Sequence, residues 1–273
     1  MVALMVQISL PVNAATPSSI DIDSHTQSVS ADQAVRFSAV VKDSSGNLIN
    51  EPIFWSTSSG SIDSEGLFTP GKAGQTIITA NSGNVNSTTS INVVAGWPVG
   101  IQSGFNQTEI SIDDEIHLNA SLVDRAGNLV AGELTWRCQN GIIDYDNNTW
   151  RPESIGNTTM RIIYLELEEQ VVFNVVPGSP QTLEIPYGLT VQSGTTQHIH
   201  PIAKDSQGNE VGISKAGELT WFVENGSISS SGLYFGGAPG LWNISVNSSS
   251  GASGVGIIRV LPAQATGLDI EID

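Results

Sequence analysis

The chain has 273 residues, a formal net charge of −17 at pH 7 and a charged fraction of only 14%. An acidic surface of this size repels phosphate backbones and anionic lipids, so the composition argues against a nucleic-acid partner. The single cysteine, Cys138, excludes an intrachain disulfide. No apolar run reaches the length of about 18 residues that a membrane-spanning helix needs, so we expect no membrane insertion.

Residues 1–16 have two interpretations. They contain an apolar run and a small-residue site, as a signal peptide does, but no basic residue precedes the run. The alternative rests on the similarity between VQISLPVNAATPSSIDID at residues 6–23 and IIRVLPAQATGLDIEID at residues 257–273. We favour this alternative, in which residues 1–16 are the last strand of a preceding repeat and residues 266–273 begin a further one.

The first repeat, residues 17–96, combines an alternating strand with a turn and a tryptophan. Apolar and small residues at 35, 37, 39 and 41 alternate with more polar ones, which predicts a strand with one buried face. The Asp-x-x-Gly-Asn sequence at residues 43–47 predicts a turn, because Asp suits its first position and Gly adopts positive φ. Trp55 follows as a predicted core residue.

The second repeat, residues 97–178, has the same landmarks. Asp124 and Trp136 each follow the corresponding residue of the first repeat by 81 positions. Matching spacings of this kind indicate an internal repeat. Cys138 lies two residues after Trp136, so we expect it on the same strand face as a small core residue.

The third repeat, residues 179–265, places Asp205 81 positions after Asp124 and Trp221 85 positions after Trp136. The four additional residues fall in the loop around residues 212–215. His198 and His200 share the solvent face of one strand. Two such side chains could begin a zinc site, but no third ligand is evident, so a solvated pair is the preferred interpretation.

About seven strands fit into each repeat, with turn signals roughly every 8–12 residues. This pattern predicts an all-β fold of tandem immunoglobulin-like β-sandwich domains with the boundaries given above. The linkers around Gly96-Trp97-Pro98 and Pro177-Gly178-Ser179-Pro180 are short and contain proline. They predict that successive domains stack as a semi-rigid rod.

The order of strand, D-x-x-G-N turn, Trp strand, G-x-I, G-L-[FY] and apolar strand resembles the bacterial Ig-like (Big) domain family. The clearest stretches are residues 55–80 and 221–246, and the resemblance covers nearly the whole chain. The second repeat departs from it, since Asn148-Thr149-Trp150 replaces G-L-[FY]. The resemblance implies an extracellular module, as in invasin- and intimin-like adhesins, surface-layer proteins, virion proteins and accessory parts of polysaccharide-degrading enzymes. It implies no particular ligand.

Carboxylates concentrate in the second repeat, which has a net charge of −8. Asp144, Asp146 and Asn148 alternate as in a calcium loop, but the glycine and glutamate of an EF-hand are absent. Asp113 and Asp114 could contribute to a calcium site between domains. Calcium is therefore the one candidate cofactor, and a solvated acidic loop is the preferred alternative.

Trp150 and Trp242, together with Trp97, are candidates for stacking on sugar rings, although core and linker packing also explains them. Eight N-x-[ST] sequons are candidate glycosylation sites. Their asparagines are Asn86, Asn106, Asn119, Asn147, Asn157, Asn225, Asn243 and Asn247.

The sequence contains no arguable Ser-His-Asp set, no nucleophile elbow and no phosphate-binding glycine loop, so no catalytic residue is predicted. We predict a non-catalytic extracellular or cell-surface region that acts as a stalk or an adhesin. Its partners are the neighbouring repeats of the same chain and, where it is adhesive, surface glycans or proteins. The alternatives are a carbohydrate-binding accessory module of a secreted hydrolase and a virion fibre decoration.

Overall fold

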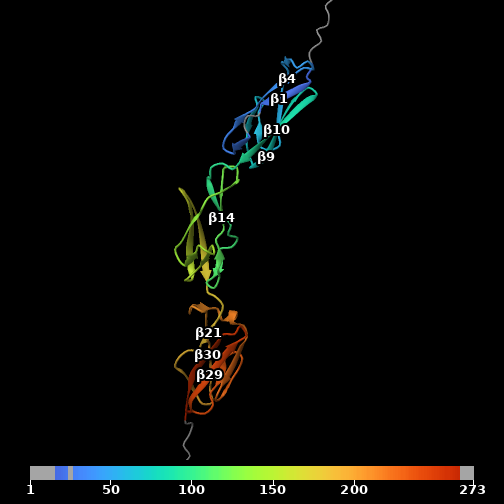
Figure 1. The fold of residues 1–273 in the computed structure, drawn as a ribbon. Coiled ribbons are helices and arrows are strands. Elements are labelled where there is room, and N and C mark those ends of the chain that lie inside the picture. The colour runs from blue at the N-terminus through green and yellow to red at the C-terminus, as the bar shows by residue number, and fades with distance from the viewer. Residues whose placement is uncertain (1–15, 24–26, 265–273) are drawn as a thin grey trace, which may run out of the picture. The chain divides into compact units, whose positions relative to one another are not determined.

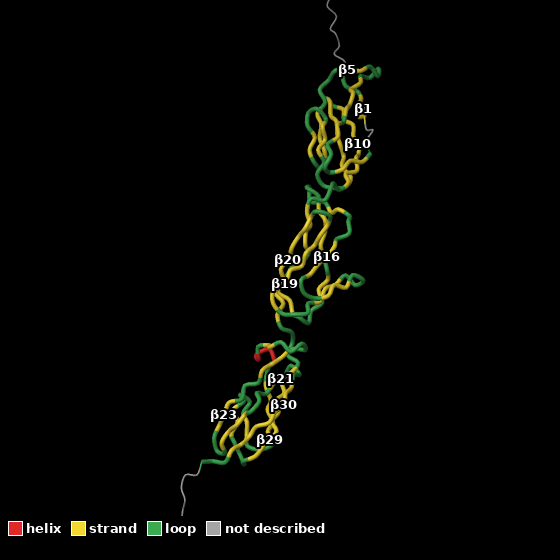
Figure 2. Tube along the Cα trace, turned by 90° about the vertical axis from the view of Figure 1, so that its left-hand side faces the viewer, coloured by secondary structure: helices red, strands yellow, loops and turns green. Residues whose placement is uncertain are grey.

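The computed structural model describes residues 16–23 and 27–264 (Figure 1). The further repeat predicted for residues 266–273, and all but residue 16 of the strand predicted for residues 1–16, lie outside the described residues. The described residues form strands β1 to β30 and a single short 3-10 helix, η1 (Ile213–Ala216), drawn red in Figure 2. The all-β prediction is confirmed. Within the described part of the chain, no helix is long and apolar enough to cross a membrane.

The chain divides into two compact units. The first comprises Met1–Gly104, Asn119–Thr135 and Ile162–Glu169, as far as these residues are described. The second comprises Phe105–Leu118, Trp136–Arg161 and Gln170–Asp273, again as far as described.

The first repeat lies in the first unit and forms three small sheets. Its strands are β1 (Ser19–Asp23), β2 (Ser28–Ser30), β3 (Val35–Arg36), β4 (Ser38–Lys42), β5 (Leu48–Ile49), β6 (Phe54–Thr57), β7 (Ser61–Ile62), β8 (Leu67–Thr69), β9 (Gly74–Ser82) and β10 (Val85–Val94). Hydrogen bonds join β1-β4-β5, β2-β10-β9-β6 and β3-β8-β7 in these orders. The same unit holds β11 (Gly100–Ser103), β14 (Ala120–Val123) and β15 (Leu129–Val130), which form the sheet β11-β14-β15.

The predicted alternation is confirmed in this repeat. Phe37 and Val41 are buried, whereas Arg36, Ser38 and Val40 are exposed. Trp55 packs against two groups of buried apolar residues, as expected of a core tryptophan. One group is Val29, Phe37, Phe68, Ile78, Ile91 and Val93, and the other is Ile20, Val41 and Ala80.

Most of the second repeat lies in the second unit. Its further strands are β12 (Glu109–Ser111), β13 (Ile116–His117), β16 (Thr135–Cys138), β17 (Ile142–Asp144), β18 (Thr149–Arg151), β19 (Gly156–Tyr164) and β20 (Leu167–Val176). They form the sheets β12-β20-β19-β16 and β13-β18-β17.

The third repeat completes the second unit with the same order of elements. Its strands are β21 (Thr182–Glu184), β22 (Leu189–Gln192), β23 (Thr196–His198), β24 (Ile202–Lys204), β25 (Glu210–Val211), β26 (Leu219–Val223), β27 (Ser227–Ile228), β28 (Leu233–Phe235), β29 (Gly240–Ser248) and β30 (Ser253–Leu261). One sheet has the order β25-β24-β21-β30-β29-β26, with β22 also paired to β30, and the other is β23-β28-β27. Buried side chains, including Trp221, Tyr234 and Ile258, form its core.

Each repeat contains more and shorter strands than the seven predicted, because strands that read as continuous are interrupted. In the first repeat Phe37 separates β3 from β4, and its N–H donates to the Gly66 carbonyl at 2.8 Å rather than to a strand neighbour. Leu118 and Ile199 make the same kind of bond, to the carbonyls of Asn148 and Gly232. The interruption is therefore part of the repeat.

The predicted D-x-x-G-N turns are confirmed three times. In the first, the Asp43 carboxylate accepts the N–H groups of Ser45 and Asn47 at 2.8 and 2.9 Å, and Gly46 has φ +82°. Asp124 and Asp205 accept the same pair of N–H groups in their own turns. Each turn is thus closed by an aspartate side chain.

Trp150 is part of the core, which corrects its assignment as a candidate for sugar stacking. It is 0% exposed and pairs with Ile116, as Phe68 pairs with Val35 and Tyr234 with Gln197. Its Nε1–H donates to the Asn140 carbonyl at 3.0 Å. An indole in a filled interior cannot contact a sugar ring.

We expect Trp150→Ala to lower the free energy of unfolding by about 3–5 kcal/mol, because it leaves a large cavity. Trp97→Ala is the matched control. Its side chain is 78% exposed, so the expected change is within about 0.5 kcal/mol. Urea denaturation of the purified chain measures both, and equal effects would contradict the assignment of Trp150 to the core.

Candidate functional sites at the linkers and on one sheet face

Two carboxylates hold the linker that follows β10, which we call the first junction. The Gly96 N–H donates to Asp124 Oδ2 at 2.8 Å, and the next N–H, that of Trp97, donates to Asp32 Oδ2 at 2.5 Å. Asp32 belongs to the first repeat, and Asp124 opens the turn after β14 of the second. Side chains from both repeats therefore hold consecutive N–H groups of one linker.

The second junction, after β20, has the same construction. The Gly178 N–H donates to Asp205 Oδ2 at 3.1 Å, and the Ser179 N–H donates to Asp113 Oδ2 at 2.8 Å. The Ser206 hydroxyl also donates to Asp113, at 3.4 Å. The junction thus recurs along with the fold.

Both linker glycines are required by space rather than by backbone conformation. A Cβ on Gly96 would lie 2.2 Å from Asp32 Oδ1, and one on Gly178 would lie 2.1 Å from Asp113 Oδ2. Neither glycine has a positive φ. Only a residue without a side chain lets the carboxylate approach the linker this closely.

The third repeat lacks both the junction aspartate and the linker glycine. Gly194 occupies the position of Asp32 and Asp113, and Ala263 follows β30 where Gly96 and Gly178 follow β10 and β20. Where the carboxylate is missing, the glycine is missing too. This paired change supports the interpretation that each carboxylate and its glycine act as one unit.

In each junction, the carboxylate that comes from the later repeat is a buried charge stabilised by hydrogen bonds. Asp124 is 3% exposed. Burial raises the pKa of its carboxyl, but donation from Gly96, Asn128 and Ala126 outweighs burial and lowers the pKa to about 2. The pKa of Asp205 is lowered by the equivalent bonds, again against the effect of burial.

The first junction has additional hydrogen bonds through Asn128. Its Nδ2 donates to Asp124 Oδ2 at 2.8 Å and to the Gly71 carbonyl at 3.1 Å, and its Oδ1 accepts the Ala73 N–H at 2.8 Å. Lys72 Nζ donates to the Ala126 carbonyl at 2.7 Å. The turn of the second repeat is thereby bonded to the loop before β9.

The carboxylates proposed for calcium are occupied by these and similar bonds. Asp113 accepts from Ser179 and Ser206, and Asp114 Oδ2 accepts the Ser111 N–H at 2.7 Å. In the described ranges no group of three or more His, Cys, Asp or Glu residues is placed to hold a metal ion. Calcium binding at these residues stays a prediction.

The acidic loop of the second repeat is a hairpin turn. Asp144 Oδ1 accepts the N–H groups of Asp146 and Asn147, as Asp63 does for Glu65 and Leu67 in the first repeat. Asn148, with φ +54°, adopts the left-handed conformation that Gly66 and Gly232 adopt. Turn closure therefore accounts for the alternation that suggested a calcium loop.

The other candidate residues lie apart from one another. Trp242 is half-buried, and its Nε1–H donates to the Ala238 carbonyl at 2.8 Å. His198 and His200 are exposed and stacked, with ring centroids 5.6 Å apart. Cys138 is half-buried, as expected beside Trp136, and burial raises the pKa of its thiol.

Seven of the eight sequon asparagines are exposed, and Asn225 is half-buried. Three of the eight use their side-chain amides in hydrogen bonds: Asn147 with Asp144, Asn225 with Ala238, and Asn243 with Glu224. The remaining five are Asn86, Asn106, Asn119, Asn157 and Asn247, all exposed.

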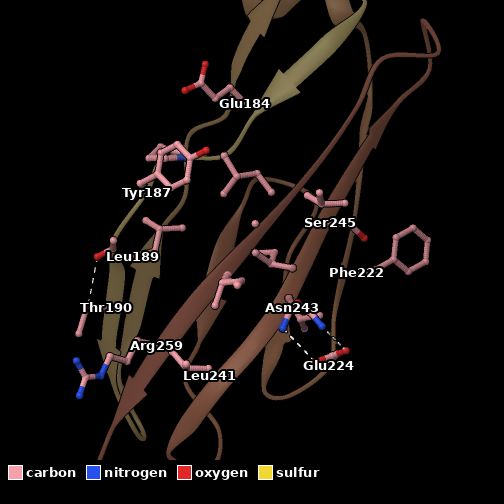
Figure 3. A pocket seen from close by; sticks show the side chains of 18 residues that line it. Glu184, Tyr187, Leu189, Thr190, Phe222, Glu224, Leu241, Asn243, Ser245 and Arg259 are labelled. Atoms are coloured by element: carbon pink, nitrogen blue, oxygen red, sulfur yellow. Dashed lines mark hydrogen bonds between the residues drawn. The ribbon is translucent and has the colours of Figure 1, made fainter.

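The third repeat also has an exposed apolar surface that the sequence did not indicate. We define the apolar face as Tyr187, Phe222, Leu241, Val255 and Ile257, which are 95%, 57%, 68%, 83% and 58% exposed. These residues line one groove over β26, β29 and β30 (Figure 3). Contiguous exposed apolar surface is characteristic of interaction sites.

Two glycines of β30 make room for the segment that forms one wall of this groove. A Cβ on Gly254 would lie 1.7 Å from the Leu183 carbonyl oxygen, and one on Gly256 would lie 2.9 Å from Ile185. Because these glycines have no side chains, β21 and the residue after it, Ile185, can lie close to β30. The chain pairs with β30 again only at β22, so residues 185–188 form a wall that carries Tyr187.

Comparison with known proteins finds likeness in structure only. No family model matches the chain, and no curated protein matches it. The similar solved structures include surface layer protein SbsC, domains 1–6, with 18% identity and a TM-score of 0.31, covering 93% of this chain and 41% of that one. Invasin, a bacterial integrin-binding protein, has 14% identity and a TM-score of 0.41, covering 88% and 59%. The extracellular domain of protocadherin gamma B4 has 13% identity and a TM-score of 0.39, covering 92% and 51%.

This chain therefore spans about half the length of the structures it resembles. TM-scores this low transfer no function to it.

We expect Gly96→Ala to destabilise the first junction, because the new methyl group collides with the Asp32 carboxylate. Overpacking of this kind costs about 1–3 kcal/mol. The double variant Gly96→Ala with Asp32→Ala removes the collision and should recover part of the loss. Thermal unfolding of the three proteins measures this. A double variant that is less stable than Gly96→Ala would contradict the paired role.

The low pKa of Asp124 predicts a dependence on pH. Its carboxylate stabilises the fold above the unfolded value near 3.8, and this contribution is lost as the pH falls toward about 2. Asp124→Asn should therefore cost stability at pH 7, about 2 kcal/mol for a buried charged hydrogen-bonding group, and less at pH 2.5. Asp43→Asn is the matched control, because the described residues show only its own turn bonded to that carboxylate. Equal losses at pH 7 would contradict a role for Asp124 beyond its turn.

Proposed function

We propose that the chain is a non-catalytic, structural or adhesive repeat region of a larger protein that acts outside the cell. The observation that carries this proposal is the repeated junction. A protein that must keep adjacent domains connected in a defined way needs interactions at every linker. Here the same pair of carboxylates supplies them twice.

The use of polar groups favours this function over catalysis. An active site gathers titratable groups with perturbed pKa values in a concave pocket. In this chain, the aspartates with lowered pKa values, Asp43, Asp124, Asp144 and Asp205, close turns, and two of them also hold linkers. The groove of the third repeat is mainly apolar and contains a single carboxylate–amide pair, Glu224 and Asn243. Its composition suits binding better than bond cleavage.

Surface composition supports an exterior location. The chain is acidic, and five exposed sequon asparagines make no side-chain hydrogen bond among the described residues. Glycans attached at these positions would project into solvent. The resemblance to bacterial Ig-like domains agrees with this location.

Antibodies raised against the purified chain test the proposal on intact cells of the source organism. We expect labelling without permeabilisation, or protein in the culture medium, while a cytosolic marker stays unlabelled. Labelling that appears only after permeabilisation would contradict an extracellular function.

Binding of the fluorescent chain to a glycan array and to whole cells separates the two forms of the proposal. Saturable binding supports the adhesive form, and its absence in a folded protein supports the structural form. Parallel samples with calcium and with a chelator determine whether either form needs the ion.

A further inference from the structure

The apolar face is specific to the third repeat. Counting back from the ends of β10, β20 and β30, Val255 corresponds to Thr88 and Gln170, and Ile257 corresponds to Ser90 and Val172. Of these four equivalent residues in the first two repeats, all but Val172 are polar.

The other two strands show the same change. Phe222 corresponds to Ser56 and Arg137 on the tryptophan strands, and Leu241 corresponds to Gln75 and Asn157 after the strand-opening glycines. Four positions on one face have therefore become apolar together. Fold requirements do not explain this, because the equivalent strands of the first two repeats pair in the same order with polar residues at seven of the eight equivalent positions, Val172 being the exception.

The strand pairings place these side chains on one surface. Phe222 pairs with Ser245, which pairs with Val255, and Leu241 pairs with Arg259. Asn243 pairs with Ile257 of β30. On the β26 side, the Glu224 carboxylate accepts the Asn243 N–H at 3.0 Å and its Nδ2–H at 2.8 Å. On this face Ser245 and Asn243 of β29 lie between Phe222 and the apolar residues of β30, and Leu241 lies further along β29. Glu224, just after β26, and Arg259 of β30 lie on opposite sides of the face (Figure 3).

Neither charge is paired with an opposite charge among the described residues, although the Glu224 carboxylate accepts hydrogen bonds from Asn243. Arg259 has no ion pair among the residues that the structure describes, and it lies across β29 from Glu224. Neighbouring strands are about 4.8 Å apart, so roughly 10 Å separates the two strands concerned. The Glu224 carboxylate is bonded to Asn243 of β29 rather than extended toward Arg259.

We propose that the apolar face binds the same face of a second copy of this chain. A two-fold axis along the strand direction exchanges the two sides of a sheet face. Arg259 of one copy then lies opposite the Glu224 side of the other, and the apolar side chains of the two faces meet. A surface that is complementary to itself in this way is what a two-fold interface requires.

Size and charge agree with a weak dimer. At about 150–250 Å² for a fully exposed large side chain, the five residues offer on the order of 600 Å², somewhat below the roughly 800 Å² per partner of a standard interface. The third repeat has a net charge of only −2, against −8 for the second, so repulsion opposes its self-association least. This inference is independent of the proposed function, which concerns where the chain acts.

Sedimentation equilibrium of the full chain tests the dimer. We expect the apparent mass to rise with concentration from 28.7 kDa toward twice that value. Ile257→Ser should weaken association at least tenfold. Val172→Ser, at the equivalent position of the second repeat and 54% exposed, is the matched control and should leave association unchanged.

Charge reversal tests the geometry. Glu224→Arg and Arg259→Glu should each weaken association, because each places like charges opposite one another, and the double variant should restore it. Unfolding curves confirm that the variants fold. A chain that stays monomeric at all concentrations, or a double variant no better than the single ones, would overturn the proposal. So would an Ile257-dependent binding to a neutral glycan by a monomeric chain, which would make the face a carbohydrate site.

Discussion

In the second and third repeats, the aspartate that opens the D-x-x-G-N turn organises both the repeat and its connection to the preceding one. A carboxylate offers several acceptor positions, and the turn uses only some of them. In the second and third repeats the rest accept N–H groups from the preceding linker. Because a buried carboxylate is costly without such donors, turn and linker stabilise each other. The linker glycine and the carboxylate of the preceding repeat complete the junction.

The three repeats share this framework but differ in what they present to solvent. The outer sheet positions of the first repeat include many Ser, Thr and Asn residues together with the exposed Phe54 and Ile77, and those of the second include Arg and Gln. The third has the apolar face, and it also lacks the junction residues at its far end, where Gly194 and Ala263 replace an aspartate and a glycine. Repetition thus maintains the core while individual repeats acquire separate surface properties.

Much of the fold could be predicted from the sequence, because its signals are periodic. The alternation at residues 35–42, the turn at residues 43–47 and the core tryptophans follow from local chemistry, and the structure confirms them. Trp150 was harder to interpret, because an inserted residue in the turn before it hid its equivalence to Phe68 and Tyr234. The three become equivalent only when the strand pairings are known.

The candidate sites were less predictable, because their residues come together only through the strand pairings and the linkers. The sequence places Asp113 near a linker, where calcium is one candidate partner and solvent the preferred one, but it does not point to the Ser179 N–H that the carboxylate accepts. The spacing of Asp32 and Asp113 by 81 residues was a signal that could have indicated the junction. The apolar face combines residues from three strands and a loop, and no single stretch of sequence shows it.

Amide hydrogen exchange at Gly96 and Gly178, followed by NMR, tests the account most directly. If carboxylates of both flanking repeats hold the linkers, these two N–H groups exchange as slowly as the amides of β10 and β20. Exchange at the rate of an unstructured linker, in a chain whose strand amides are protected, would contradict it.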